Sequence, residues 1–324
     1  MTLRTRFTEM FGCEIPIQLA PMGGVATPEL IGAVIEAGGM GALGAGPMPG
    51  PVLAGALEQV RTKTQGPLLV NFLMPFMEID AVEVAARHAQ CVDFYHGEPD
   101  ASLIALVHRA GARAGWQVGS LDDAVKAVRA GCDILTVRCI EGGGRMHGKE
   151  SLWPLLCDVL GTVNVPVLAA GGIGDARGVA AALAAGAAGV RMGTRFLATK
   201  ESAVHPRYRE ALISASAADT VLTDEFREGW PDDRSFARVL RSSLEAARQF
   251  DGAIVGEFTI GGMTEPVPRF GVPMPLATST GTVAAMAMYA GESVRFVRAV
   301  EPAALIVRSV AAEAEKLLQA AAPV

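Results

Sequence analysis

The chain has few aromatic residues, few charged residues and no dense block of Lys and Arg. Aromatic side chains make up 6% of the 324 residues and charged side chains 19%, while half of the residues are hydrophobic. The core must therefore be built mainly from Ala, Val, Leu and Ile, which suits a parallel sheet wrapped by helices. The formal net charge of −6 offers no basic surface of the kind that nucleic acids require, so we expect no nucleic-acid partner.

The sequence also lacks paired cysteines and long apolar segments. Its five cysteines form no Cys-x-x-Cys pair, which predicts reduced thiols in place of a metal site or disulfides and favours a cytoplasmic location. The first seven residues contain two arginines and no apolar signal core, and Gly or Pro interrupts the uncharged stretches farther along the chain. We therefore expect a soluble protein that does not bind membranes.

Short apolar runs alternate with helical patterns along most of the chain. Eight runs are predicted as strands, over residues 15–20, 41–45, 68–72, 91–95, 114–118, 133–138, 165–170 and 187–192. Helices are predicted between them, over residues 29–37, 52–62, 81–89, 102–110, 121–130, 152–160 and 178–185, with an eighth beginning at about Glu201. This alternation predicts an α/β fold, a (β/α)8 TIM barrel.

The alternation stops between about residues 221 and 280, where Pro, Gly and charged residues become frequent. We expect this segment to be an insertion or lid packed on the barrel, with residues 229–234 at a surface turn. Apolar residues from 286 to 297 and the Ala-rich stretch 303–321 predict C-terminal helices that pack back on the barrel. The predicted barrel domain is therefore residues 1–220 together with the helices of 281–324.

Two glycine-rich turns follow the last two predicted strands. They read AAGGIG at residues 169–174 and VRMGT at residues 190–194. Glycine lets the backbone approach an oxyanion closely, and N–H groups at a helix N-terminus donate to it. Any α/β protein can also use such a turn merely to pass from strand to helix. Two adjacent turns at the usual phosphate site of a barrel favour phosphate binding.

Polar residues follow several other predicted strands, at the end of the barrel where catalysis takes place. Asn71, His96, Gln117 and Arg138 lie at the ends of the third to sixth strands. The loop EGGGRMHG at residues 141–148 comes next, and its glycines surround Arg145 and His147. An arginine can hold an anion and a histidine can accept a proton. Taken singly, each of these residues has an ordinary structural explanation as well.

Several segments resemble the nitronate monooxygenase family, also called 2-nitropropane dioxygenase-like. They are IPIQLAPMGG (15–24), EAGGMGALGAG (36–46), VNF (70–72), AAGGIG (169–174) and VRMGTRFLA (190–198). The resemblance implies an FMN cofactor whose phosphate lies on Gly171, Gly172, Gly193 and Thr194. It also implies that Pro21, Met22, Asn71, Gln117 and Gly143 approach the flavin ring and ribityl chain. The predicted cofactor-binding set is completed by Gly23, Arg138, Ala170 and Met192.

The loop after the sixth strand departs from the family pattern. Family members usually read Glu-Ala-Gly-Gly-His there, and the position of that histidine falls on Arg145 in this chain, with His147 two residues later. His147 is therefore the leading candidate for the base, with Arg145 as anion holder and His96 as a second candidate base. Family members also tend to have Gln in place of Arg138, so a guanidinium here would face the polar edge of the flavin.

The activity that the resemblance implies is oxidation of nitronates or nitroalkanes, with O2 as the redox partner. An alternative is an NAD(P)H-dependent FMN reductase of an enoyl thioester or a quinone, which the exchanged Arg and His keep open. A flavin-free barrel lyase or isomerase acting on a phosphorylated metabolite would use the same glycine turns for the phosphate of its substrate. The partners expected are a small-molecule substrate and the redox partner, and a homodimer is a candidate oligomeric state.

Overall fold

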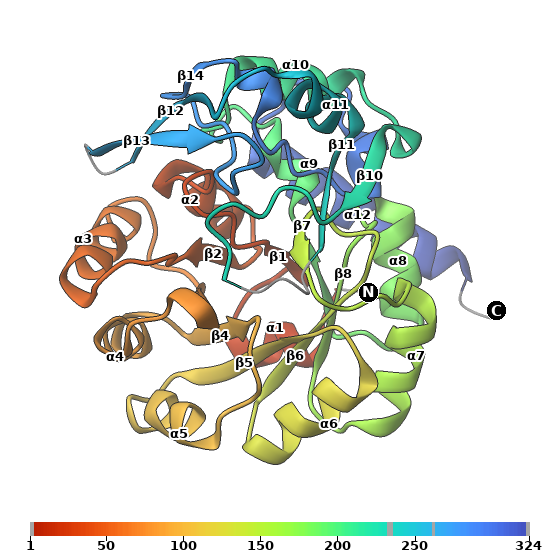
Figure 1. Ribbon diagram of the computed structural model, residues 1–324. Coiled ribbons are helices and arrows are strands. Elements are labelled where there is room, and N and C mark those ends of the chain that lie inside the picture. The colour runs from red at the N-terminus through yellow and green to blue at the C-terminus, as the bar shows by residue number, and fades with distance from the viewer. Residues whose placement is uncertain (1–2, 232–235, 261–262, 322–324) are drawn as a thin grey trace.

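The computed structural model describes residues 3–231, 236–260 and 263–321, and its centre is a parallel eight-stranded barrel (Figure 1). The strand order is β1-β9-β8-β6-β5-β4-β3-β2, and a parallel bridge between Gln18 and Met40 joins the two ends. All eight predicted strands are confirmed. Their bounds are β1 (Ile17–Leu19), β2 (Gly41–Gly44), β3 (Leu68–Leu73), β4 (Cys91–Tyr95), β5 (Arg113–Val118), β6 (Ile134–Arg138), β8 (Val167–Ala170) and β9 (Gly189–Met192).

Seven helices connect these strands on the outside of the barrel, and in Figure 1 helices α3 to α7 run around its left, lower and right sides. Local sequence fixes their ends: the Thr27 side chain accepts the Leu30 N–H at the start of α2, and Gly131 ends α6 in the left-handed conformation. The predicted helices in these places are confirmed. Their bounds are α2 (Pro28–Glu36), α3 (Gly50–Arg61), α4 (Ile79–His88), α5 (Ala101–Arg109), α6 (Leu121–Ala130), α7 (Leu152–Thr162) and α8 (Ala176–Ala184).

The last helix of the barrel is α12 (Ala303–Ala321), which packs against both α8 and α2. The prediction of a helix that begins at about Glu201 is wrong. β9 leads instead into the short α9 (Thr194–Leu197), and the next helix, α10 (Pro206–Ser214), begins where His205 caps it and Pro206 fixes its first turn. The chain thus makes a long excursion between the last strand of the barrel and the helix that completes it. At the other end, α1 (Arg6–Phe11) packs its buried Phe7 near the start of β9.

The segment between β9 and α12 forms a layer over the barrel, and α10, α11 (Arg241–Gln249) and β12 to β14 lie at the top of Figure 1. It holds the antiparallel sheet β13-β12-β14, made of β12 (Ile254–Ile260), β13 (Met263–Pro268) and β14 (Thr280–Gly281). A second sheet, β10-β11-β7, joins β10 (Thr220–Thr223) and β11 (Phe236–Leu240) to β7 (Gly144–Met146). Residues 281–300 contain two short 3-10 turns, at Val283–Ala285 and Glu292–Phe296, in place of the predicted helices.

The pairing of β7 with β11 connects the glycine loop after β6, residues 141–148, to the overlying layer, because Arg145 lies opposite Ala237 in this sheet.

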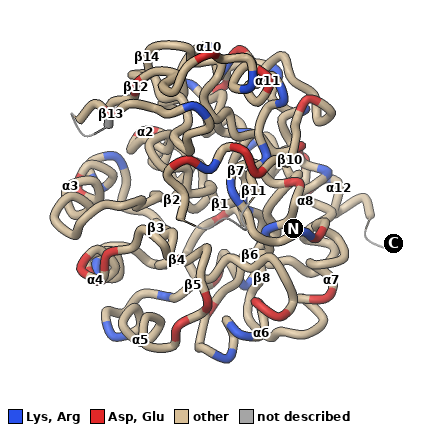
Figure 2. Tube along the Cα trace, in the orientation of Figure 1, with Lys and Arg blue, Asp and Glu red and all other residues tan. Residues whose placement is uncertain are grey.

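Charged residues of both signs are interspersed along the outer elements (Figure 2). Four of the five cysteines are buried and Cys157 is exposed, and all five are free. Within the described ranges, no helix is long and apolar enough to cross a membrane.

Candidate active site

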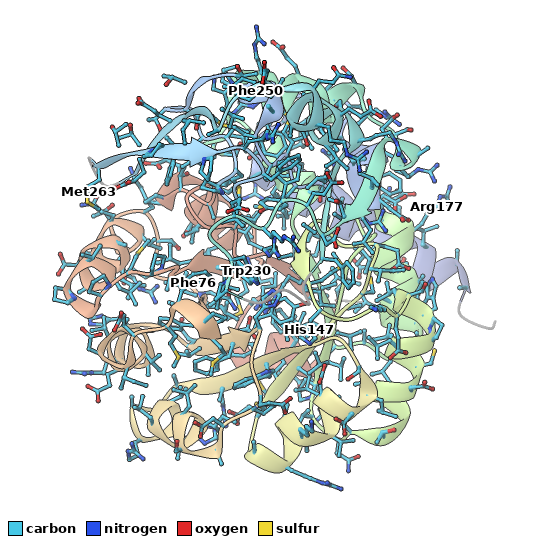
Figure 3. All side chains as sticks on the ribbon, in the orientation of Figure 1. Phe76, His147, Arg177, Trp230, Phe250 and Met263 are labelled. Atoms are coloured by element: carbon cyan, nitrogen blue, oxygen red, sulfur yellow. The ribbon has the colours of Figure 1, made fainter. Side chains whose placement is uncertain are left out.

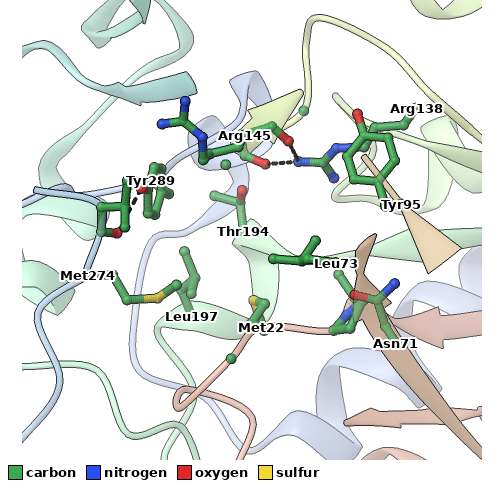
Figure 4. Close-up of a pocket in the computed structure, with 18 of the residues that line it drawn as sticks. Met22, Asn71, Leu73, Tyr95, Arg138, Arg145, Thr194, Leu197, Met274 and Tyr289 are labelled. Carbon is green, nitrogen blue, oxygen red and sulfur yellow. Dashed lines mark hydrogen bonds between the residues drawn. The ribbon is translucent and has the colours of Figure 1, made fainter. Parts of the chain in front are cut away.

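A cavity of about 480 Å³ lies at the carboxyl ends of the barrel strands, between the barrel and the overlying layer (Figure 4). This is the end of a (β/α)8 barrel that carries active sites. The cavity wall includes most of the residues that the sequence predicted for the site: Pro21, Met22, Gly23, Asn71, His96, Gln117, Arg138, Gly143, Arg145, Ala170, Gly171, Gly172, Gly193 and Thr194. Met192 and His147 do not line the cavity: Met192 is buried in the barrel core, and His147 contacts the lining residue His96.

Backbone N–H groups gather at one end of this cavity. Gly171 and Gly172 both have positive φ, at +117° and +69°, and a Cβ on Gly171 would lie 2.3 Å from the Cys139 Sγ atom, so only glycine fits there. Gly193 and Thr194 begin α9 beside them. Among the described residues, no backbone hydrogen bond outside the helices and strands uses the N–H of Gly172, Ile173, Gly193 or Thr194. Such a group of free donors at two turns is suited to an oxyanion.

A buried hydrogen-bond network supports the opposite side of the cavity. Asp93, 1% exposed, accepts hydrogen bonds at Oδ2 from Asn71 Nδ2 at 3.1 Å and from Gln117 Nε2 at 3.0 Å. The same oxygen pairs with Arg191 Nη1 at 2.8 Å. Asn71 and Gln117 were predicted from sequence, whereas Asp93 and Arg191 were missed. A charged residue inside an apolar strand was the signal that could have found both, because a charge buried there needs a partner.

The glycine loop is held in place by arginines. Arg138 Nη2 donates to the carbonyl oxygens of Gly143, at 2.5 Å, and of Arg145, at 3.1 Å (Figure 4). The Arg145 guanidinium donates to the carbonyl of Phe226 and lies over the Trp230 ring, with its Cζ 4.5 Å from the ring centroid. Both side chains therefore shape the cavity wall by joining the loop to neighbouring segments. The anion-holding role predicted for Arg145 stays a prediction.

His96 lines the cavity in an uncommon backbone conformation, with φ of +60° directly after β4. Within the described part of the chain, its Nδ1 atom is buried and has no hydrogen-bond partner. Burial lowers the pKa of His96 well below its usual 6.5, and the nearby His147, Arg138 and Arg145 lower it further. The ring is thus neutral at neutral pH, and Nδ1 is able to accept a proton.

His147 contacts His96 but does not line the cavity. The two ring centroids are 5.6 Å apart, and His147 Nε2 lies 3.2 Å from Asp123 Oδ2. Its side chain is 30% exposed. The geometry therefore favours His96 over His147 as the group that reaches a bound substrate, which reverses the order expected from sequence.

The overlying layer contributes an apolar wall that the sequence did not indicate. Trp230 was expected at a surface turn, but it lines the cavity, with its ring centroid 5.2 Å from that of Phe76 and 4.8 Å from that of His96 (Figure 3). Residues 232–234 of that predicted turn fall outside the described residues. The wall is completed by Leu197, Tyr208, Phe258, Val272, Pro273, Met274, Leu276 and Tyr289.

Comparison with known protein families identifies the family of this chain. A model of the family described as nitronate monooxygenase matches residues 4–88 and 78–313. The chain belongs to the nitronate monooxygenase family. It is therefore a flavin-dependent oxidoreductase, and its barrel and glycine turns are those expected from the resemblance noted in the sequence.

Relatives of known name fall into two groups. A "(3aS,4S,5R,7aS)-5-hydroxy-7a-methyl-1-oxo-octahydro-1H-indene-4-carboxyl-CoA dehydrogenase" of Mycobacterium tuberculosis is 37% identical over 247 residues, which is 75% of this chain and 68% of that protein. A probable nitronate monooxygenase of Staphylococcus aureus is 29% identical over 272 residues, covering 69% of this chain and 76% of the relative.

Solved structures of similar fold also carry different names. FabK from Thermotoga maritima has a TM-score of 0.79 and 31% identity, with 98% of both chains covered. A nitroalkane oxidase from Streptomyces ansochromogenes has a TM-score of 0.74 and 28% identity, covering 98% of this chain and 99% of that one. The fold, including the layer over the barrel, is thus shared by proteins of different names.

Proposed function

We propose that the cavity binds FMN and that the protein oxidises nitronates or nitroalkanes with O2. The observation that best supports FMN binding is the pair of turns at Gly171–Gly172 and Gly193–Thr194, which bring backbone N–H donors together. At Gly171 there is no space for a side chain. The chemistry of the wall also fits FMN, because its polar side chains come from the strand ends and face an otherwise apolar cavity.

Different residues of the chain have different roles in such a reaction. FMN, when bound, supplies the redox chemistry. The two glycine turns hold its phosphate, and Asn71 and Gln117, fixed by Asp93, contact its ring system. His96 accepts the α-proton of a neutral nitroalkane at Nδ1, which is buried and unpaired in the described structure. Trp230 and Phe76 exclude bulk water from the same side.

A second candidate function is the NAD(P)H-dependent reduction of an enoyl thioester or a quinone. Two observations favour a thioester substrate: the relative from Mycobacterium tuberculosis is named for a carboxyl-CoA compound, and the layer over the barrel lines the cavity with apolar side chains such as Phe258 and Met274. This wall provides room for the nonpolar body of a substrate larger than a simple nitroalkane. The flavin-free lyase or isomerase expected as a further alternative does not fit a member of this family.

The first test is the cofactor itself. We expect the purified protein to be yellow and to release FMN, identified by its mass, at about one molecule per chain, because the donors at the two turns form a phosphate site. In the same preparation, adding a nitronate should cause uptake of O2. A colourless protein that takes up no added FMN would overturn the proposal.

A further inference from the structure

A buried ion pair crosses the inside of the barrel next to the cavity. Arg191 on β9 and Asp93 on β4 are 3% and 1% exposed, and Arg191 Nη1 lies 2.8 Å from Asp93 Oδ2. β4 and β9 are not neighbours in the sheet, so the two side chains meet across the barrel interior. Arg191 lines the cavity, whereas Asp93 lies behind it. A buried pair costs much desolvation and so calls for an explanation beyond stability.

One nitrogen of the Arg191 guanidinium is left for the cavity. Its Nε atom donates to Gln18 Oε1 at 2.6 Å, and its Nη1 atom donates to Asp93. Within the described residues no hydrogen bond uses Nη2, and Nη2 is not among the buried polar atoms that lack a partner. Because Arg191 lines the cavity, Nη2 is the nitrogen that a bound molecule can reach.

Asp93 also determines which atoms of the neighbouring amides face the cavity. A carboxylate can only accept hydrogen bonds, so Asn71 and Gln117 must turn their NH2 groups toward Asp93 Oδ2. Their carbonyl oxygens are then the atoms free to accept from a ligand. This part of the wall therefore presents one cationic donor, from Arg191, and two neutral acceptors.

We propose that Arg191, balanced by Asp93, binds the pyrimidine edge of the flavin and raises its midpoint potential. The inference rests on the proposed FMN site. That edge carries an N–H donor flanked by carbonyl and ring-nitrogen acceptors, which complements the two acceptors and the cationic donor, and a cation there stabilises the negative charge of the reduced ring. Arg138, which the sequence suggested for this edge, instead uses Nη2 on the carbonyls of Gly143 and Arg145.

Removing either member of the ion pair should shift the flavin midpoint potential, in opposite directions. Arg191→Gln removes the cation and leaves the carboxylate of Asp93 near the flavin, so the potential should fall. Asp93→Asn removes the carboxylate and leaves the guanidinium unbalanced, so the potential should rise. Both substitutions break the same ion pair, and a purely structural role would not give shifts of opposite sign.

The experiment measures the midpoint potential of the FMN-loaded protein against reference dyes, with the dissociation constant of sulfite as a second readout. Sulfite forms a bond from sulfur to flavin N5 and places the negative charge on the pyrimidine edge. We expect Arg191→Gln to weaken sulfite binding by about tenfold or more, the effect of a unit charge a few ångströms away. Asp93→Asn should tighten it. Arg248→Gln, at an exposed surface pair with Glu225, is the matched control and should change neither value.

The double variant Arg191→Gln/Asp93→Asn keeps the test decisive if a single variant fails to fold, because it leaves no unpaired charge. Its potential should lie below that of the wild type, since the cation is nearer the cavity than the carboxylate. Shifts of the same sign in both single variants, or an unchanged potential in the double variant, would overturn the role of Arg191. Failure of the wild type to bind FMN would instead refute the proposed function.

Discussion

His96→Ala is expected to lower kcat/KM for a neutral nitroalkane by about 10² to 10⁴-fold, the usual effect of removing a general base. A preformed nitronate has already lost its proton, so its rate should fall far less. The reason is the position of His96, which lines the cavity with a buried, unpaired Nδ1 in the described structure. Steady-state kinetics with both substrates measure the difference, and His88→Ala, on α4 outside the cavity, is the matched control.

The pH dependence of kcat/KM provides a second test of His96 as the base. Burial and the nearby positive groups lower the pKa of His96 well below 6.5, so the ring is unprotonated above that lowered value. The acid limb of kcat/KM for a nitroalkane should therefore lie below pH 6.5, with no loss through neutral pH. His147→Ala should have the smaller effect and should move this limb upward, because His147 is one of the groups that lower the pKa of His96. A larger loss in His147→Ala than in His96→Ala, at equal FMN content, would contradict the assignment.

Gly193→Val is expected to raise the dissociation constant of FMN by about tenfold or more, a loss of about 1.4 kcal/mol of binding free energy, so that the purified variant carries less flavin. A Cβ at this position would lie 3.1 Å from the Ala20 Cβ atom and 3.7 Å from the Met22 Sδ atom, all at the cavity wall. The two methyl groups of valine would then occupy space beside the N–H donors of the second turn. Flavin absorbance of the purified variant, before and after incubation with added FMN, measures the effect.

The control for this variant is Gly55→Val. Gly55 lies on the exposed side of α3, and no atom lies within 4 Å of the position of its added Cβ. This substitution should leave FMN content unchanged, which separates loss of the phosphate site from a general cost of valine in place of glycine. Full FMN content in Gly193→Val would show that the phosphate lies elsewhere.

The sequence predicts the barrel well because its signals are local. Apolar runs of four to six residues, as in β8 (Val167–Ala170), are bounded by turn residues, and caps such as Thr27 fix the helix ends. The carboxyl ends of parallel strands meet at one end of a barrel, so the strand pattern by itself places residues such as Asn71 and Gln117 in one site.

The layer over the barrel is less predictable because its contacts are long-range. The helix that completes the barrel, α12, follows the whole layer, and no local pattern near Glu201 shows this. Trp230 belongs to a segment with the composition of a surface turn, yet tertiary packing places it against Phe76 and His96. The order of His96 and His147 likewise depends on which ring faces the cavity, which spacing along the chain does not specify.

The central claim is that a nitronate is the reductant of the bound flavin. The most direct measurement mixes the FMN-loaded protein anaerobically with a nitronate and, separately, with NADH and with NADPH, and follows loss of flavin absorbance by stopped flow. We predict fast bleaching by the nitronate and rapid return of colour when O2 is admitted. Fast bleaching by a nicotinamide with none by the nitronate would contradict the account and assign the cavity to reduction of an enoyl thioester or a quinone.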